Sequence, residues 1–172
     1  MIRIANAGGY WGDDLNQFKR QVELGPIDYV TLDYLAEVTM SILQKQRSRD
    51  PGAGYARDFV TQMERILPTI ATNGVRVISN AGGVNPRACA AAVRAAADKL
   101  GVGDKVKIAL VTGDDLLDEL DALTAAGEPF SNMDTGAPLS DVRSQVRSAN
   151  AYLGMKSIVD ALDQGATIVI TG

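Results

Sequence analysis

Five short runs of apolar and β-branched residues divide the chain, and each has the length of a buried strand. None alternates cleanly between apolar and polar residues, which is typical of strands covered on both faces in a parallel sheet. The runs are IRIAN at 2–6, DYVTL at 28–32, VRVIS at 75–79, VKIALV at 106–111 and ATIVITG at 166–172.

Helical patterns lie between these runs, and several have recognisable ends. Leu35, Val38, Ile42 and Leu43 have the spacing of one apolar helix face. Asn85 and Pro86 form a cap and first position for an alanine-rich helix that ends at Gly101. The patterns predict helices at 13–24, 34–46, 55–72 (kinked or divided at Pro68), 86–100, 115–127 and 151–164.

Strand and helix therefore alternate from end to end. This order predicts a single α/β domain over 1–172: a doubly wound, mostly parallel, Rossmann-like sheet of about five strands with helices on both faces. The segment 47–54 reads as a loop, and 128–150 as a long polar insertion with one helical turn from Ser140. Such an insertion is a lid or partner contact, or simply a solvated loop. Because nothing follows the last strand to cover it, we expect an N-terminal part of a longer protein.

Composition narrows the class of protein. The chain has 172 residues, a net charge of −4 and one cysteine, Cys89, which gives no reason to expect nucleic acid or membrane partners and suits a cytoplasmic location. It has no histidine, which excludes Ser-His-Asp, Cys-His and histidine-metal chemistry within these residues. A bound cation would need oxygen ligands, with Mg²⁺ as the candidate. Cys89 lies in the alanine-rich helix and is interpreted as a core residue, the alternative being a reactive thiol favoured by the nearby helix N-terminus.

Similar loops follow several strands. NAGG occurs at 6–9 and 80–83, GDDL at 12–15 and 113–116, and the strand ends VTG and ITG resemble each other. Ligands of open α/β sheets bind beyond the carboxyl ends of the strands, and glycine lets them approach the backbone. Neither loop is a Walker A or GxGxxG motif, and a glycine pair can be only a turn. The predicted ligand-binding residues are Asn6, Gly8, Gly9, Asn80, Gly82, Gly83, Asn85, Arg87, Asp114 and Thr171.

Four carboxylates are candidates for chemistry. Asp33 and Glu37, four apart at a predicted helix start, would project from one face and could act as acid and base. Asp13 and Asp14 suit hydroxyls, an amine or Mg²⁺. The alternative is that the aspartates only cap helices and that Glu37 is solvated. Arg87, with Asn85 beside it at a helix start, would favour an anion.

The chain resembles the acyclic terpene utilisation protein A family along its whole length. The resemblance is carried by NAGGYWGDDL, DYLAEVTMSIL, ARDFV, NAGGVNPRACA, GDDLL, SANAYLG and IVITG, in that order. It implies a place in the breakdown of acyclic terpenoids such as citronellol and geraniol through acyl-CoA intermediates. It supplies no catalytic residues to carry over.

Two functional hypotheses follow. The first is an enzyme domain acting on a small acyl-CoA thioester or hydroxy-acid by hydration, dehydration or a related lyase step. Asn6, Asn80, Asn85 and Arg87 would then orient the ligand, and the carboxylates would supply acid–base or Mg²⁺ chemistry. The second is a non-catalytic module, a partner subunit or homo-oligomer, that docks on a CoA-dependent enzyme through 128–150. A nucleotide-binding regulator is disfavoured because no phosphate loop is recognisable.

Overall fold

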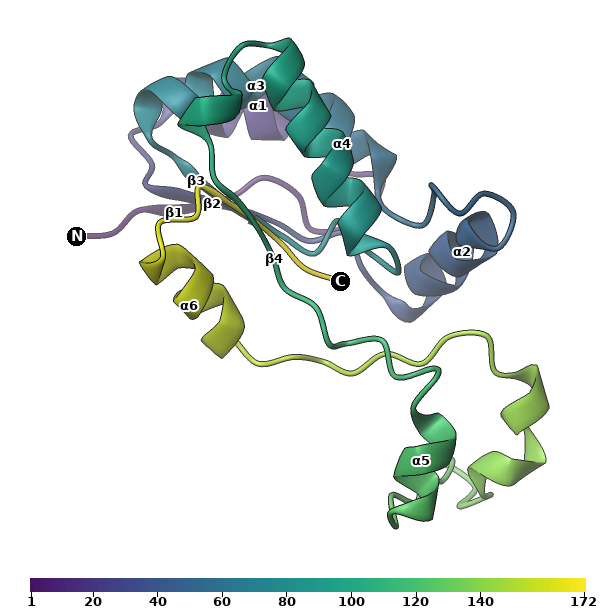
Figure 1. The fold of residues 1–172 in the computed structure, drawn as a ribbon. Helices are drawn as coiled ribbons and strands as arrows, with labels where there is room; N and C mark the ends of the chain where they lie inside the picture. The colour runs from purple at the N-terminus through teal and green to yellow at the C-terminus, as the bar shows by residue number, and fades with distance from the viewer. The chain divides into compact units, whose positions relative to one another are not determined.

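The computed structural model describes residues 1–172 and contains a five-stranded sheet in which every neighbouring pair of strands is parallel (Figure 1). The order across the sheet is β1-β2-β3-β5-β4. All five predicted strands are confirmed, each shorter than its apolar run. They are β1 (Ile4–Asn6), β2 (Tyr29–Leu32), β3 (Arg76–Ser79), β4 (Ile108–Leu110) and β5 (Ile168–Ile170).

Six helices and three short 3-10 turns complete the chain. The helices are α1 (Asn16–Leu24), α2 (Glu37–Arg47), α3 (Arg57–Asn73), α4 (Pro86–Lys99), α5 (Leu120–Ala125) and α6 (Lys156–Asp163). The turns are η1 (Gly103–Lys105), η2 (Leu139–Asp141) and η3 (Arg143–Gln145). The predicted α/β class with helices on both faces of the sheet is confirmed (Figure 1).

The strand order determines which face each helix covers. The chain moves in one direction from β1 to β4 and returns to β5, so right-handed crossovers put α6 on the face opposite α1, α3 and α4. The packing agrees. Ile168 and Ile170 of β5 belong to the core under α1, α3 and α4, whereas Val169 packs with Ile158 and Leu162 of α6.

Several predicted helices have other bounds in the structure: α2 starts at Glu37 rather than residue 34, and α6 starts at Lys156 rather than residue 151. For α1 and α5, hydrogen bonds at the start of the predicted helix explain the difference. α1 starts at Asn16 rather than residue 13, because Asp14 accepts hydrogen bonds from Asn16 and holds a turn. α5 is only six residues long because Leu116 N–H donates to the Ala149 carbonyl, so the start of the predicted helix is extended. α3 runs unbroken through Pro68.

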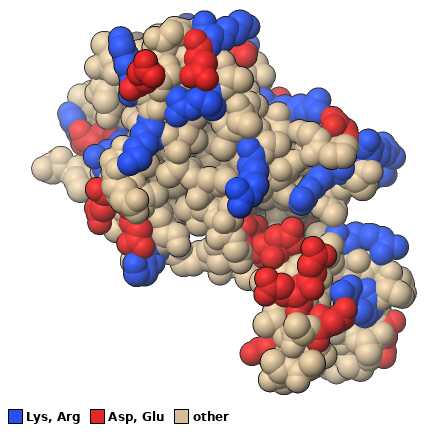
Figure 2. All heavy atoms as spheres, in the orientation of Figure 1, with Lys and Arg blue, Asp and Glu red and all other residues tan.

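The chain forms two compact units. The first comprises residues 1–112 and 154–172 and contains the sheet; the second comprises residues 113–153 and contains the insertion predicted at 128–150. The second unit carries eight acidic residues and two arginines, and its acidic side chains gather on the surface seen in Figure 2. None of the helices is both long and apolar enough to cross a bilayer.

Candidate functional site

Loops that follow four of the strands meet at the carboxyl edge of the sheet. Asp33 N–H, after β2, donates to the Gly8 carbonyl after β1 at 2.9 Å. Gly82 N–H, after β3, donates to the Thr171 carbonyl after β5 at 3.0 Å. The segments 6–9, 33–34, 80–83 and 171–172 therefore form one continuous rim, which is where an open parallel sheet binds ligands.

The side chain of Asn80 joins the middle of this rim. Its Oδ1 accepts the Tyr34 N–H at 2.8 Å, and its Nδ2 donates to Asp33 Oδ1 at 2.7 Å. Leu35 N–H donates to the same Asp33 oxygen at 3.2 Å. Asn80 therefore positions the Asp33 carboxylate. The sequence predicted Asn80 only as a ligand-binding residue and gave no sign of this role.

Asp33 presents its second oxygen, Oδ2, without any partner in the chain, and its side chain is exposed. The predicted pairing with Glu37 on one helix face is wrong. α2 begins at Glu37, its N-cap is Ala36, and Asp33 lies in the loop before it. Asp33 is not the helix cap either, because its carboxylate serves the turn at Leu35. Asp33 thus belongs to the rim, whereas Glu37 belongs to α2.

The second NAGG segment is packed inside the protein. A side chain at Gly82 would collide with the Thr171 carbonyl and would come within 2.6 Å of Pro86 Cβ. Gly83 has a positive φ of 53°, and a side chain there would collide with Leu43 and lie 2.8 Å from the Gly54 carbonyl. Packing and backbone conformation therefore explain both of these glycines.

The first NAGG segment has the same letters and the opposite environment. Side chains built at Gly8 and Gly9 would meet nothing within 4 Å, and neither residue has a positive φ. Gly8 N–H donates to Asn6 Oδ1 at 3.0 Å, and Gly9 N–H to Asp13 Oδ2 at 3.1 Å. Nothing within this chain requires glycine at these two positions. The backbone of Gly8 and Gly9 is therefore accessible to a ligand on this side of the rim.

Tyr10 and Trp11 follow this open pair and have different surroundings. Tyr10 is exposed. Trp11 is partly buried against the core, and its Nε1 donates to Asp58 Oδ2 of α3 at 3.0 Å. The loop is thereby tied to the helix layer beside the rim, through an indole contact that the sequence did not predict.

The predicted metal residues hold their own loop together. Asp13 Oδ1 accepts Asp14 N–H, and its Oδ2 accepts Gly9 N–H. Asp14 accepts from the backbone and side chain of Asn16 and from Gln17, and these bonds, the Asn16 backbone bond foremost, lower the pKa of Asp14. No three Cys, Asp or Glu side chains are grouped to hold a metal ion. Mg²⁺ binding here stays a prediction that rests on two carboxylates alone.

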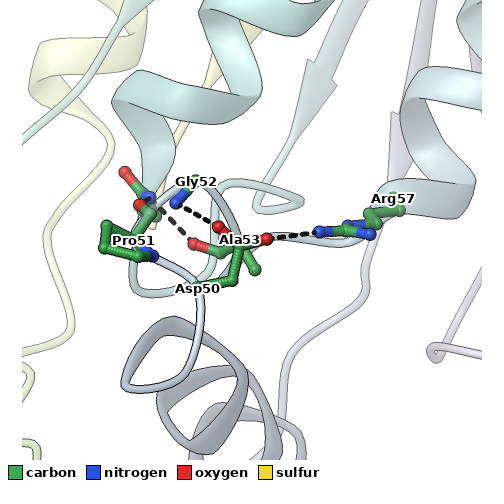
Figure 3. Close-up of polar contacts among 6 residues, drawn as sticks. Asp50, Pro51, Gly52, Ala53 and Arg57 are labelled. Carbon is green, nitrogen blue, oxygen red and sulfur yellow. Dashed lines mark hydrogen bonds and ion pairs between the residues drawn. The ribbon is translucent and has the colours of Figure 1, made fainter.

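Asn85 caps α4 as predicted and also fixes a neighbouring loop. Its Oδ1 accepts Ala88 N–H at 3.3 Å, while its Nδ2 donates to the carbonyls of Pro51 and Ala53. Figure 3 shows the loop, in which Asp50 accepts Gly52 N–H and the Arg57 guanidinium. Both polar ends of the Asn85 amide serve the fold, so we assign it to building the rim.

The remaining predicted ligand residues are placed as follows. Arg87 lies in the first turn of α4, is exposed and has no partner in the chain. Thr171 is partly buried and its Oγ1 donates to the Gly172 carbonyl at 3.0 Å. Asp114 belongs to the second unit, where its buried carboxylate accepts Asn150 Nδ2 at 2.9 Å.

Two buried groups beneath the rim are structural. Tyr34 Oη accepts Gln62 Nε2 at 2.8 Å in the core, and burial raises the pKa of Tyr34 well above its usual range. Burial also raises the pKa of the Cys89 thiol to about 12. A thiol that is inaccessible and protonated does not act as a nucleophile, so the interpretation of Cys89 as a core residue is confirmed.

Comparison with known proteins adds the family. A family model described as "Acyclic terpene utilisation family protein AtuA" matches residues 2–172. No curated protein and no solved structure matches the chain. Since the match covers nearly every residue, including the whole rim, the chain belongs to the acyclic terpene utilisation family.

Proposed function

We propose that this chain is an enzyme domain that acts on a small acyl-CoA thioester or hydroxy-acid intermediate of acyclic terpenoid breakdown. The family supports a role in acyclic terpene utilisation. The reaction we propose is the addition or removal of water, or a related lyase step, which requires a positioned proton acceptor and donor.

The observation that carries the proposal is the state of Asp33. One carboxylate oxygen is fixed by Asn80 and Leu35 N–H, and the other, on an exposed side chain, has no partner in the chain. A carboxylate that is held in orientation at the carboxyl edge of a parallel sheet can take and return a proton at a bound substrate. Glu37 has no such support from a neighbouring strand end, so we assign the acid–base role to Asp33.

The proposed step balances with water alone. As water adds to the β-carbon of an unsaturated thioester, Asp33 takes the proton that water loses, and the α-carbon then receives that proton. Dehydration is the reverse, with the proton leaving the α-carbon and the hydroxyl group departing as water. Asp33 returns to its starting state in both directions.

The open glycine pair provides room for the substrate beside this carboxylate. Gly8 accepts the Asp33 N–H through its carbonyl, so it is directly adjacent to Asp33 in the rim. Asn6 Nδ2 has no partner in the chain and can donate to a carbonyl or hydroxyl oxygen. Arg87, exposed and unpaired, can bind a phosphate of CoA.

Two measurements on the chain test the proposal: binding of acyl-CoA thioesters and turnover of an unsaturated thioester. Ligand-detected NMR against saturated, unsaturated and 3-hydroxyacyl-CoA thioesters, with and without Mg²⁺, should show binding that Gly8→Val weakens. Asp33→Asn should retain binding and lose hydration by at least about a hundredfold, the usual contribution of a general base. Asp104→Asn, an exposed aspartate of η1, is the matched control. A flat response to every thioester, or full turnover by Asp33→Asn, would refute the assignment.

A second candidate is a docking module, and the second unit favours it. Met133 and Tyr152 are 96% and 95% exposed there, in a unit that carries eight acidic residues and two arginines. A partner that covers both side chains would remove this apolar surface from water. Under this hypothesis the double variant Met133→Ser, Tyr152→Ser abolishes assembly with a CoA-dependent enzyme, and Asp33→Asn leaves turnover unchanged. Under the enzyme hypothesis Asp33→Asn abolishes turnover, and the double variant leaves it unchanged.

A further inference from the structure

Helix α2 carries an apolar stripe that nothing in the chain covers. The sequence predicts one buried face formed by Leu35, Val38, Ile42 and Leu43, but Leu43 is the only one of the four that is fully buried. Leu35 lies before the helix and packs partly against the core. Val38 is 70% and Ile42 44% exposed. The predicted face is therefore divided between the protein interior and its surface.

The exposed part of the stripe is regular. Val38, Ser41, Ile42 and Lys45 are separated by three, four and seven positions, so they lie on one side of the helix. Leu43 lies on another side, where it contacts Gly83 of the packed NAGG segment. The contact with Gly83 fixes the orientation of α2, and the stripe faces outward.

The charges at the two ends of α2 favour a second copy of the same helix as the partner that covers the stripe. Glu37 is the first residue of the helix and Lys45 lies in its last turn, both are exposed, and neither has an ion-pair partner in the chain. A helix that is acidic at its start and basic at its end is complementary to an antiparallel copy of itself. The midpoint between the two charges is Ser41, whose small side chain permits close approach.

We propose that α2 pairs with α2 of a second copy of this chain, antiparallel about a two-fold axis at Ser41. Glu37 of each copy pairs with Lys45 of the other, and Val38 and Ile42 bury against their equivalents. Such an interface is self-complementary, as two-fold symmetry requires. The aliphatic stem of Lys45 covers apolar surface while its ammonium group reaches the carboxylate.

The size of the interface sets the expected strength. One eleven-residue helix per copy offers less than the roughly 800 Å² per partner of a standard interface. We therefore expect a weak dimer whose population rises with protein concentration. Sedimentation velocity over a wide concentration range measures this association directly.

Matched variants distinguish this interface from nonspecific hydrophobic association. Ile42→Asp should weaken dimerisation at least about tenfold. Val159→Asp, at an equally exposed valine of α6 (44%), should leave it unchanged. Glu37→Lys and Lys45→Glu should each weaken the dimer, and the double variant should restore it. Circular dichroism verifies that each variant is folded.

Cross-linking tests the position of the axis. Under oxidation, Ser41→Cys should form a disulfide-linked dimer, whereas Ser157→Cys on exposed α6 should not, and Cys89 is buried and does not interfere. The proposal is overturned if the protein is monomeric at all concentrations. It is equally overturned if Ile42→Asp and Val159→Asp dimerise alike, or if the charge-reversed double variant fails to recover.

Discussion

The amide of Asn80 connects two strand ends, since it accepts the Tyr34 N–H at 2.8 Å and donates to Asp33 Oδ1 at 2.7 Å. Each bond joins the loop after β3 to the loop after β2, so one side chain sets the spacing of the rim. The carboxylate that we propose as the acid–base group thus depends on a residue of a different strand.

Asn80→Ala should destabilise the fold by about 1–3 kcal/mol, because it leaves the Tyr34 N–H without its acceptor. Asn6→Ala, the equivalent change in the first NAGG segment, removes only the exposed bond to Gly8 N–H and should cost clearly less. Urea unfolding of both variants measures the difference. Equal losses would contradict the inequivalence of the two asparagines.

The glycine pairs should respond oppositely to alanine. Gly82→Ala and Gly83→Ala force a methyl group into the Thr171 carbonyl or into Leu43, and should cost about 1–3 kcal/mol or prevent folding. Gly8→Ala and Gly9→Ala meet open space in an ordinary backbone conformation, and should change stability by less than about 1 kcal/mol. Thermal unfolding of the four single variants compares them directly.

The two NAGG segments have the same sequence but different environments, and this difference could not be predicted from the sequence. Strand runs and the Asn85–Pro86 helix start are determined locally, and these predictions were confirmed. Whether a glycine pair is packed or open depends on residues distant in sequence. Thr171, Leu43 and Gly54 surround the second pair, and no comparable residues surround the first.

The misplaced carboxylate pair has a similar cause. Asp33 and Glu37 have helical spacing, but Asn80 and Leu35 N–H hold Asp33 in the loop after β2, and α2 starts after it. α5 is short because Ala149, far along the chain, accepts the Leu116 N–H. The hydrogen bonds of Asn80 and Ala149, which come from distant segments, set these helix boundaries. The spacing of apolar residues along the chain cannot reveal such bonds.

Acid should weaken the N-terminal edge of the sheet through Asp28. The Arg3 guanidinium, and then the Arg3 N–H, donate to this carboxylate and lower the pKa of Asp28 from 3.8 to about 2. Because the folded pKa is depressed, the stabilisation is present above the unfolded-state value and is lost as the pH falls through about 2.

Asp28→Asn should therefore reduce the dependence of unfolding free energy on pH between about 5 and 2. Glu64→Gln, at an exposed glutamate of α3 without an ion pair, is the control and should preserve the dependence. Urea unfolding at several pH values gives both slopes. Parallel curves for the wild type and Asp28→Asn would exclude this contribution.

The hydrogen bond between Trp11 and Asp58 should be visible in fluorescence, because Trp11 is the only tryptophan. Asp58→Ala removes the acceptor of the indole N–H and frees the loop that follows Gly8 and Gly9. Acrylamide quenching of the tryptophan should increase, while Glu64→Ala on the same helix should leave it unchanged. Unaltered quenching in Asp58→Ala would mean that the loop is held by packing alone.

Asn150 should control the integrity of the second unit. It donates to the buried Asp114 carboxylate at 2.9 Å and pairs with Asp115 through a backbone bridge. Asn150→Ala leaves a buried carboxylate short of a donor, which costs about 1–3 kcal/mol. Amide hydrogen exchange should therefore accelerate across 113–153 and stay unchanged in the sheet. Asn132→Ala, at an exposed turn of the same unit, should affect only residues 132–137. Acceleration that extends into β3 or β5 would show that the two units unfold together, because a local defect cannot open a core that folds separately.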